Sequence, residues 1–292
     1  MLFALLTLGG PTAAAGFEPL TVIDAAGRRV TLSREPRRIV TVFSSNTELV
    51  AALGLADRIV GIDALTVHPP EILDRPRIGG RLGMSVDAVI AQRPDLVLLT
   101  PARQAAHQLI EPLSRLGVPA IVLMSRSLDE VLANLRLLGD VCGVPGRAEA
   151  LALGLEQRLQ AVRRAHADRA PPSIVMVTGS VGNGIVLIAR HDSYTGDAIV
   201  AAGARLALRP RAGLAQVSLE ALWQADPDVL LFAGSSTALD VLLREPGWRR
   251  LTAVRTGRVQ AVARGEFLIP GPRTVDGVEK LARWLQSVAG GS

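Results

Sequence analysis

Residue types that catalyse reactions or bind metal ions are present in this chain, but they are widely separated. The glycine-rich segment 179–184 lacks the Lys-Ser/Thr ending of a phosphate-binding loop. His191, Asp192 and Ser193 are the residue types of a hydrolytic triad, but neighbours in sequence do not form that geometry. No two histidines have the spacing typical of a metal site, the four being His68, His107, His166 and His191. The sequence therefore predicts no catalytic centre, no cofactor and no directly bound metal ion.

Two carboxylates occupy equivalent positions in a repeated segment, in which residues 85–99 resemble residues 218–232. In both copies a Ser precedes a predicted helix, and an acidic residue follows two positions later. The Ser suits the N-cap, and the acidic residue favours the positive end of the helix dipole. A helix–turn–strand unit can acquire such similarity by chance. The repeat nevertheless favours two lobes of common design, with Asp87 and Glu220 at equivalent places.

Strands and helices alternate along the chain around these segments. The first predicted strand, Arg38 to Phe43, is followed by a predicted loop at Ser44 to Asn46. The capping-box pattern from Ser45 to Glu48 predicts a helix that runs towards Leu53. Because strands alternate with helices, we expect parallel sheets with helices on both faces. Further strands are predicted at residues 58–62, 96–99, 120–123 and 173–177.

A long helix separates two such alternating regions. Residues 147–167 contain no Pro, and their apolar residues fall on one face of a helix that is roughly 30 Å long. Pro171 and Pro172 end it. We therefore predict an α/β fold of two Rossmann-like lobes with parallel sheets, joined by this single long helix. The predicted boundaries are an N-terminal lobe at 17–145, a linking helix at 146–170 and a C-terminal lobe at 171–292.

Composition and charge exclude nucleic-acid binding. The chain has 292 residues, of which 49% are hydrophobic, and this is enough apolar material for two cores. Its formal net charge is +5, but the arginines are scattered among acidic residues. The basic runs and interleaved aromatic residues of nucleic-acid binders are absent from the sequence. We therefore expect a small-molecule ligand and no nucleic-acid partner.

Residues 1–16 are uncharged and apolar and end in small residues, which is the pattern of a cleaved secretory signal peptide. The segment is too short to span a membrane, so we expect no direct membrane insertion. The alternative is a buried N-terminal strand or helix. Cys142 is the only cysteine, so neither an intrachain disulfide nor an acylated cysteine after the leader is expected. These features predict a protein that is free in the periplasm.

Several segments resemble, in order and spacing, the ABC-transporter substrate-binding proteins for iron chelates, heme and cobalamin. In that family two lobes joined by one long helix hold the ligand on loops that follow the strands. This agrees with ligand binding at the carboxyl ends of strands in open α/β sheets. The resemblance implies a monomeric receptor that captures a metal chelate and delivers it to a permease with its ATPase. The matching segments are Pro36–Glu48, Ala52–Gly61, Pro76–Leu99, Gly257–Val259 and Pro270–Arg273.

The resemblance also implies which residues contact the ligand. Three of them are arginines, and guanidinium groups suit an anionic ferric chelate because they bind carboxylates and catecholates. A ferric siderophore is therefore the first expectation, followed by heme and then cobalamin. Heme receptors of this family commonly have Tyr where this chain has Gly80, and Trp223, Trp248 and Trp284 lie away from the expected cleft. The expected ligand-binding residues are Phe43, Ser44, Ser45, Asn46, His68, Arg81, Arg103, Tyr194, Arg264 and Phe267.

One surface carboxylate in each lobe pairs with arginines of the permease in this family, and the matching positions are Asp87 and Glu220. Glu is usual at both positions, so Asp87 is a departure that shortens the reach by one methylene group. Two alternatives are an enzyme with a cofactor in the cleft of the same two-lobed fold, and a binding module that senses its ligand. The leader and the lack of a catalytic grouping weigh against the enzyme.

Overall fold

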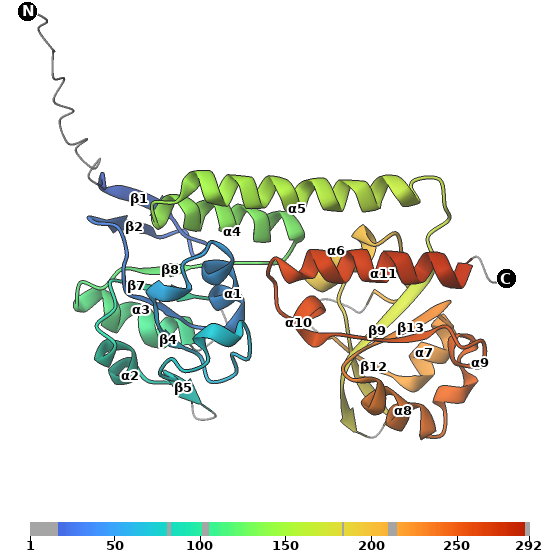
Figure 1. Cartoon of the computed structure of the whole chain (residues 1–292). Helices are drawn as coiled ribbons and strands as arrows, with labels where there is room; N and C mark the ends of the chain where they lie inside the picture. The colour runs from blue at the N-terminus through green and yellow to red at the C-terminus, as the bar shows by residue number, and fades with distance from the viewer. Residues whose placement is uncertain (1–16, 81–82, 101–104, 183, 210–214, 290–292) are drawn as a thin grey trace, which may run out of the picture.

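The computed structural model describes residues 17–80, 83–100, 105–182, 184–209 and 215–289, and its elements form two lobes side by side (Figure 1). The N-lobe comprises the elements from β1 to α4, and the C-lobe comprises those from β9 to α11. Helix α5 lies along the same side of both lobes (Figure 1). The structure therefore confirms the predicted α/β fold of two lobes joined by one long helix.

The N-lobe is built on a four-stranded parallel sheet in the order β4-β3-β7-β8. Leu96 and Leu98 of β7 pack in one apolar cluster, while Val97 and Leu99 pack in another, so both faces of the sheet are covered. The elements of this lobe are β1 (Leu20–Ile23), β2 (Arg29–Leu32), β3 (Ile39–Thr41), α1 (Ser44–Ala52), η1 (Ala56–Arg58), β4 (Ile59–Ile62), η2 (Pro70–Ile72), β5 (Gly79–Gly80), β6 (Gly83–Met84), α2 (Val86–Ala91), β7 (Leu96–Leu99), α3 (Ala105–Arg115), β8 (Ala120–Val122) and α4 (Leu128–Val141).

The C-lobe sheet has the order β12-β10-β9-β13-β14, and β11 also pairs with β9. Strands β9, β13 and β14 are parallel, whereas β10 and β12 add an antiparallel edge. The strand predicted at 173–177 is the first half of β9, which continues to Gly182. The elements of this lobe are β9 (Ser173–Gly182), β10 (Ile185–Ile188), α6 (Tyr194–Ala201), β11 (Arg205–Leu206), β12 (Gln216–Ser218), α7 (Leu219–Ala225), β13 (Val229–Ala233), α8 (Ser236–Arg244), η3 (Trp248–Arg250), α9 (Thr252–Arg255), β14 (Val259–Val262), α10 (Arg264–Phe267) and α11 (Arg273–Ala289).

Helix α5 spans Pro145–His166, which is close to the predicted helix at 147–167. Its buried residues are spaced alternately by four and three positions, so they form one stripe along the helix. The stripe packs in the same apolar cluster as residues of α1, α4, α6 and α11, and one core therefore joins the two lobes. The buried residues of the stripe are Ala148, Ala152, Leu155 and Leu159.

Contacts near its start and in its second half hold α5 against its neighbours. Near its start, α4 approaches so closely that a Cβ atom added to Gly139 would lie 2.2 Å from Cβ of Ala148. Further along, Arg158 binds Asp276 at 2.6 Å and Glu279 at 2.8 Å, both on α11. Helix α5 is thus fixed to the N-lobe through α4 and to the C-lobe through α11.

The start of α1 differs from the predicted capping box. The helix begins at Ser44, inside the predicted loop, and no side chain caps it. Phe43 precedes it with φ of 76°, which is uncommon for a residue other than glycine. Of the two side chains expected at the cap, Ser45 is buried within the helix and Glu48 contacts Arg273 of the C-lobe. Tertiary contacts therefore replace local capping at this helix.

Candidate ligand site between the lobes

The turn between β3 and α1 presents two of the four consecutive residues expected at the ligand. Phe43 and Ser44 are half-buried, and the Phe43 ring packs against an apolar cluster of the N-lobe. The Ser44 Oγ atom lies 3.3 Å from Oγ1 of Thr66, in the loop after β4. A partly exposed aromatic ring and a hydroxyl group are therefore available at this edge of the sheet.

The other two residues belong to the scaffold. Asn46 Nδ2 donates to Val42 O at 2.6 Å and lies 3.3 Å from Thr100 Oγ1, so it joins the carboxyl ends of β3 and β7. Asn46 is 1% exposed, and Ser45 beside it is also buried. Because both side chains are buried in this structure, Phe43 and Ser44 are the more exposed members of the turn, and contact of Ser45 and Asn46 with a ligand stays a prediction.

An arginine organises the loop after β4, from Asp63 onwards. Arg77 Nη1 donates to the carbonyl oxygen of Asp63 at 3.2 Å and to that of Thr66 at 2.7 Å. Two apolar side chains of the same loop, Leu65 and Val67, are 80% and 78% exposed. Because its backbone is tethered, this loop can present both side chains to an apolar ligand surface at little cost in ordering.

Arg264 joins the carboxyl ends of two strands in the C-lobe. Its Nη1 atom donates to Thr178 O of β9 at 3.0 Å and to Ala233 O of β13 at 3.2 Å. Both bonds use Nη1, and within the described residues Nε and Nη2 remain for an anion. On the nearby hairpin of β9 and β10, Val181 and Ile185 are 56% and 37% exposed. The C-lobe edge thus combines a cation with apolar side chains.

Tyr194 begins α6, where the N-cap Ser193 accepts a hydrogen bond from the backbone N–H of Gly196 at 3.3 Å. Burial raises the pKa of the Tyr194 hydroxyl; the Glu48 carboxylate acts in the same direction, while Arg264 opposes it. The hydroxyl therefore stays protonated through the physiological range. Tyr194 can donate a hydrogen bond to a ligand between the lobes.

Phe267 and the expected arginines of the N-lobe add nothing to the described site. Phe267 is 1% exposed and packs in the core that joins the lobes, while its carbonyl oxygen accepts from Thr195 Oγ1 at 2.7 Å. The ring completes that core in this structure, and its contact with a ligand stays a prediction. Arg81 and Arg103 lie outside the described residues.

A buried ion pair joins the lobes at their seam. Glu48 of α1 has a side chain that is 4% exposed, and it accepts two hydrogen bonds from Arg273 at the start of α11. The bond from Nε to Oε2 is 2.9 Å long. Gly271 lies against the carboxylate, where an added Cβ atom would be 3.2 Å from Oε2. Sequence reasoning missed this pair because 225 residues separate its members and Glu48 was assigned to helix capping.

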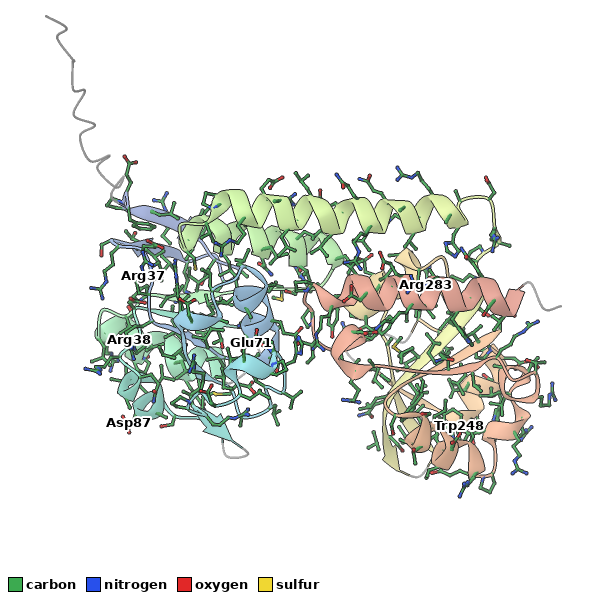
Figure 2. All side chains as sticks on the ribbon, viewed as in Figure 1. Arg37, Arg38, Glu71, Asp87, Trp248 and Arg283 are labelled. Atoms are coloured by element: carbon green, nitrogen blue, oxygen red, sulfur yellow. The ribbon has the colours of Figure 1, made fainter. Side chains whose placement is uncertain are left out.

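A hollow of about 170 Å³ opens beside this ion pair. It is lined by α1, His68 and Glu71 on one side and by Pro272 and Arg273 on the other, so both lobes contribute to it. Figure 2 shows Glu71 on the side of the N-lobe that faces the C-lobe. Sites for drug-sized ligands usually measure about 300–1,000 Å³, so this hollow holds only part of a chelate. His68 is the one expected ligand residue that lines it.

The two carboxylates expected at the transporter are exposed on short helices of opposite lobes. Ser85 Oγ accepts from the N–H of Ala88 at 3.1 Å, and Ser218 Oγ accepts from the N–H of Ala221 at 3.3 Å, so both predicted N-caps are confirmed. Asp87 and Glu220 lie in the first turns of α2 and α7. Asp87 points away from the body of the N-lobe (Figure 2). Neither carboxylate is part of the ligand site.

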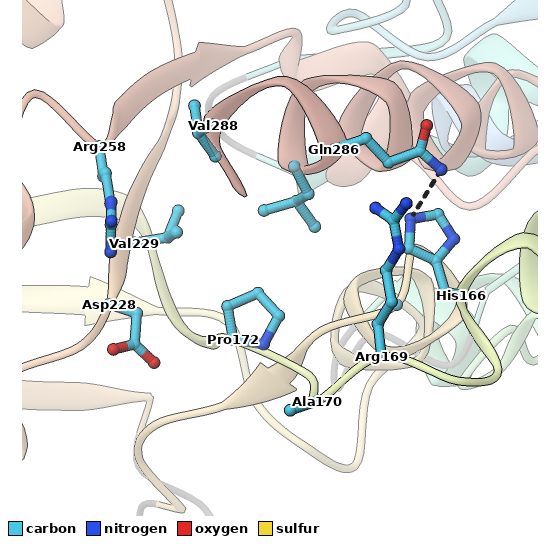
Figure 3. Close-up of a pocket in the computed structure, with 11 residues that line it drawn as sticks. His166, Arg169, Ala170, Pro172, Asp228, Val229, Arg258, Gln286 and Val288 are labelled. Atoms are coloured by element: carbon cyan, nitrogen blue, oxygen red, sulfur yellow. Dashed lines mark hydrogen bonds between the residues drawn. The ribbon is translucent and has the colours of Figure 1, made fainter. Parts of the chain in front are cut away.

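A larger hollow, of about 590 Å³, lies at the opposite edge of the C-lobe (Figure 3). It opens at the amino ends of β9, β13 and β14, between the last turns of α5 and α11. There His166 Nε2 lies 3.4 Å from Gln286 Nε2. This hollow contains none of the expected ligand residues. We therefore place the candidate site at the carboxyl ends of the strands, where Arg264 and Tyr194 have hydrogen-bond donors available for a ligand.

Across the described parts of the chain, no three His, Cys, Asp or Glu side chains are grouped so that they could hold a metal ion. In those same residues, no helix combines the length and the apolar character that crossing a membrane requires.

Comparisons with known proteins agree on one family. A family model described as periplasmic binding protein matches residues 39–262. An uncharacterized ABC transporter substrate-binding lipoprotein of Bacillus subtilis is 28% identical over 268 residues, which covers 90% of this chain and 84% of that protein. A cobalamin-binding protein of Halobacterium salinarum is 28% identical over 277 residues, covering 90% and 73%. Among solved structures, a periplasmic heme-binding protein from Pseudomonas aeruginosa matches with a TM-score of 0.72 and 29% identity, covering 85% of this chain and 91% of that one.

Proposed function

Since this chain belongs to the periplasmic binding protein family, we propose that it captures a metal chelate between its lobes and delivers it to the permease of an ABC importer. Its similarity to transport proteins rather than to enzymes supports a binding function without turnover. We propose further that residues 1–16 direct export to the periplasm, where the mature protein acts as a monomer.

Strand-end loops of both lobes support a ligand site between them. Exposed apolar side chains lie on a loop of the N-lobe and on a hairpin of the C-lobe. Arg264 provides a cation at the same edge of the C-lobe. A ligand that fits both features has apolar surface and at least one anionic group. The proposed ligand class rests on this combination of exposed apolar side chains and an available cation. The apolar side chains are Leu65, Val67, Val181 and Ile185.

Heme meets both conditions, because an apolar macrocycle carries two carboxylates. Arg264 would bind one carboxylate, and the protonated hydroxyl of Tyr194 would donate to an oxygen of the ligand. We therefore place heme ahead of the ferric siderophore that the sequence alone favours. An anionic ferric siderophore is the second candidate, since it suits Arg264 but uses the apolar loops less. Cobalamin is third, because its periphery is mostly amide rather than carboxylate.

Asp87 and Glu220 are the proposed contacts with the permease. Each is exposed at the start of a short helix, and each comes from a different lobe. Carboxylates so placed can meet arginines on a membrane partner without disturbing the ligand site. Charge pairs across an interface chiefly set the rate of encounter and the register of docking.

Thermal unfolding of the mature protein with hemin, a ferric hydroxamate siderophore and cyanocobalamin tests the proposed ligand. A ligand at 100 times its Kd stabilises the native state by about 2.7 kcal/mol, so the cognate chelate raises Tm clearly. Arg264→Gln should weaken binding of hemin about tenfold or more, through loss of a charge-assisted hydrogen bond. Arg255→Gln, an exposed arginine on α9, is the matched control and should bind as the wild type does. A Tm that no chelate moves, but that an amino acid or a sugar raises, would show that the proposed ligand class is wrong.

A further inference from the structure

An arginine lies over an indole ring on the same surface as one of the docking carboxylates. The guanidinium carbon of Arg250 is 4.0 Å from the centroid of the Trp223 ring. Trp223 belongs to α7 and follows Glu220 by three residues, so both lie on neighbouring positions of one helix. Arg250 itself is exposed, while Trp223 is half-buried.

The structure builds this stack through a close approach of two segments. Gly247 has φ of 106°, and a Cβ atom added to it would lie 3.1 Å from Cζ2 of Trp223. Only glycine suits this position, because other residues rarely adopt that φ and would crowd the ring. Trp223 Nε1 donates to Gly247 O at 2.9 Å. The turn is anchored next to these contacts by Trp248, which is 1% exposed in the C-lobe core (Figure 2).

Arg250 is therefore a pre-organised cation rather than a freely moving one. A stacked guanidinium loses less conformational freedom when it binds a partner than a solvated side chain does. Its charge also reaches Glu220. Hydrogen bonds with its own backbone N–H and with Ser218 hold the pKa of Glu220 below its usual value, and the positive charge of Arg250 acts in the same direction.

In the part of the N-lobe that the structure describes, no counterpart to this stack is found. The repeat that pairs Asp87 with Glu220 places Ile90 at the position of Trp223. Among the described residues, Arg250 over Trp223 is the one cation–aromatic stack found, and it belongs to the C-lobe. Within the described residues, the two halves of the docking surface therefore differ, because a stacked cation lies beside the carboxylate of α7 and no such stack accompanies the carboxylate of α2.

We propose that Glu220 and Arg250 together form a docking site of mixed charge on the C-lobe, and that the permease presents an acidic group beside the arginine that receives Glu220. This inference rests on the proposed delivery to a permease. A permease surface that carries arginines alone would repel Arg250, since like charges at an interface cost affinity. The stacked arginine thus selects a partner with both charges in the matching order.

Association of the hemin-loaded protein with the importer in lipid nanodiscs tests this proposal. Arg250→Glu should slow association about tenfold at 50 mM salt and less at 200 mM, because the attraction is electrostatic. Arg250→Ala should lie between this variant and the wild type. Arg249→Glu is the matched control, since Arg249 is exposed on the same turn but does not lie over the ring. It carries the same change of net charge and should slow association less than twofold.

Equal effects of Arg249→Glu and Arg250→Glu would overturn the proposal, because the net charge alone would then explain both. Unchanged association of Arg250→Glu would overturn it as well. Failure of the proposed function has a different signature, in which Glu220→Arg also associates like the wild type, or in which hemin does not bind. Thermal unfolding of each variant confirms that it is folded, since loss of one exposed cation–aromatic contact should lower Tm only slightly.

Discussion

Breaking the ion pair between Glu48 and Arg273 tests whether a buried polar contact holds the two lobes together. Arg273→Met removes the cation but keeps most of the apolar stem. It leaves the Glu48 carboxylate, whose side chain is 4% exposed, without its partner. Removing one member of a buried ion pair costs about 3–5 kcal/mol, because the remaining charge is poorly hydrated. The Arg273 side chain is 30% exposed, so water reaches that side of the pair and we expect a loss of about 3 kcal/mol.

Urea unfolding followed by circular dichroism measures this loss. Arg283→Met is the matched control on the exposed face of the same helix (Figure 2), and it should change the free energy of unfolding by less than about 0.5 kcal/mol. The double variant Glu48→Leu/Arg273→Met replaces the pair by apolar side chains. Such replacements are often neutral, so the double variant should be more stable than Arg273→Met alone.

Two results would refute this reasoning. A loss below about 1 kcal/mol for Arg273→Met would place the pair among exposed ion pairs of little energetic weight. A double variant that loses the sum of the two single losses would show that the carboxylate and the guanidinium do not depend on each other. Either result would remove the ion pair from the forces that hold the lobes in place.

Three further predictions concern the spine, the response to acid and the motion of the lobes. Gly139→Ala should destabilise the protein by about 1–3 kcal/mol in thermal unfolding, because the added Cβ atom would meet Ala148, whereas Gly154→Ala, with no atom nearby, should stabilise it by about 0.5–1 kcal/mol. Burial opposes ionisation of Asp24, but hydrogen bonds from Arg28 and from the N–H of Val122 hold its pKa below the usual value. The native pKa is therefore below the unfolded one, so stability from Asp24 is lost as pH falls below about 4, and Asp24→Asn should show a smaller loss on acidification in urea unfolding. X-ray scattering should show only slight compaction on binding of hemin, since α5 offers no hinge; a large compaction would refute a rigid spine.

The sequence predicts local features of this fold well. The spine helix, the strands of the N-lobe and the N-caps at Ser85 and Ser218 all follow from periodicity and from turn chemistry, which depend on residues within a few positions of one another. The antiparallel edge formed by β10 and β12 was not predicted, because two short strands can pair in either direction with the same apolar pattern.

A contact between residues far apart in the chain, and the burial of a side chain, cannot be read from local sequence patterns. Glu48 follows a serine at the spacing of a capping box, yet its partner is Arg273 in the other lobe. Asn46 and Phe267 are expected at the ligand because the resemblance places them in loops that follow strands; both side chains are buried in the structure, and their contact with a ligand stays a prediction. Burial is a property of the assembled fold, so sequence spacing alone does not distinguish a lining side chain from a core one.

Only part of the stack of Arg250 on Trp223 can be recognised in the sequence. A Pro-Gly turn followed by Trp248 and two arginines is visible in the sequence, and Gly247 has the positive φ that such turns require. The sequence does not reveal that this turn packs on α7, beside Glu220. The docking function of Asp87 and Glu220 stays a prediction from the resemblance and the repeat.

ATP-driven uptake of hemin into vesicles that contain the importer tests the central claim most directly. The variant Asp87→Arg/Glu220→Arg should bind hemin with the affinity of the wild type, because both carboxylates are exposed and lie outside the candidate ligand site. It should nevertheless support no uptake and no stimulation of the ATPase, and Glu220→Arg alone should have a larger effect than Asp87→Arg, whose side chain is shorter. Uptake by the double variant at the rate of the wild type would contradict the account and leave the two carboxylates with a structural role at their helix starts.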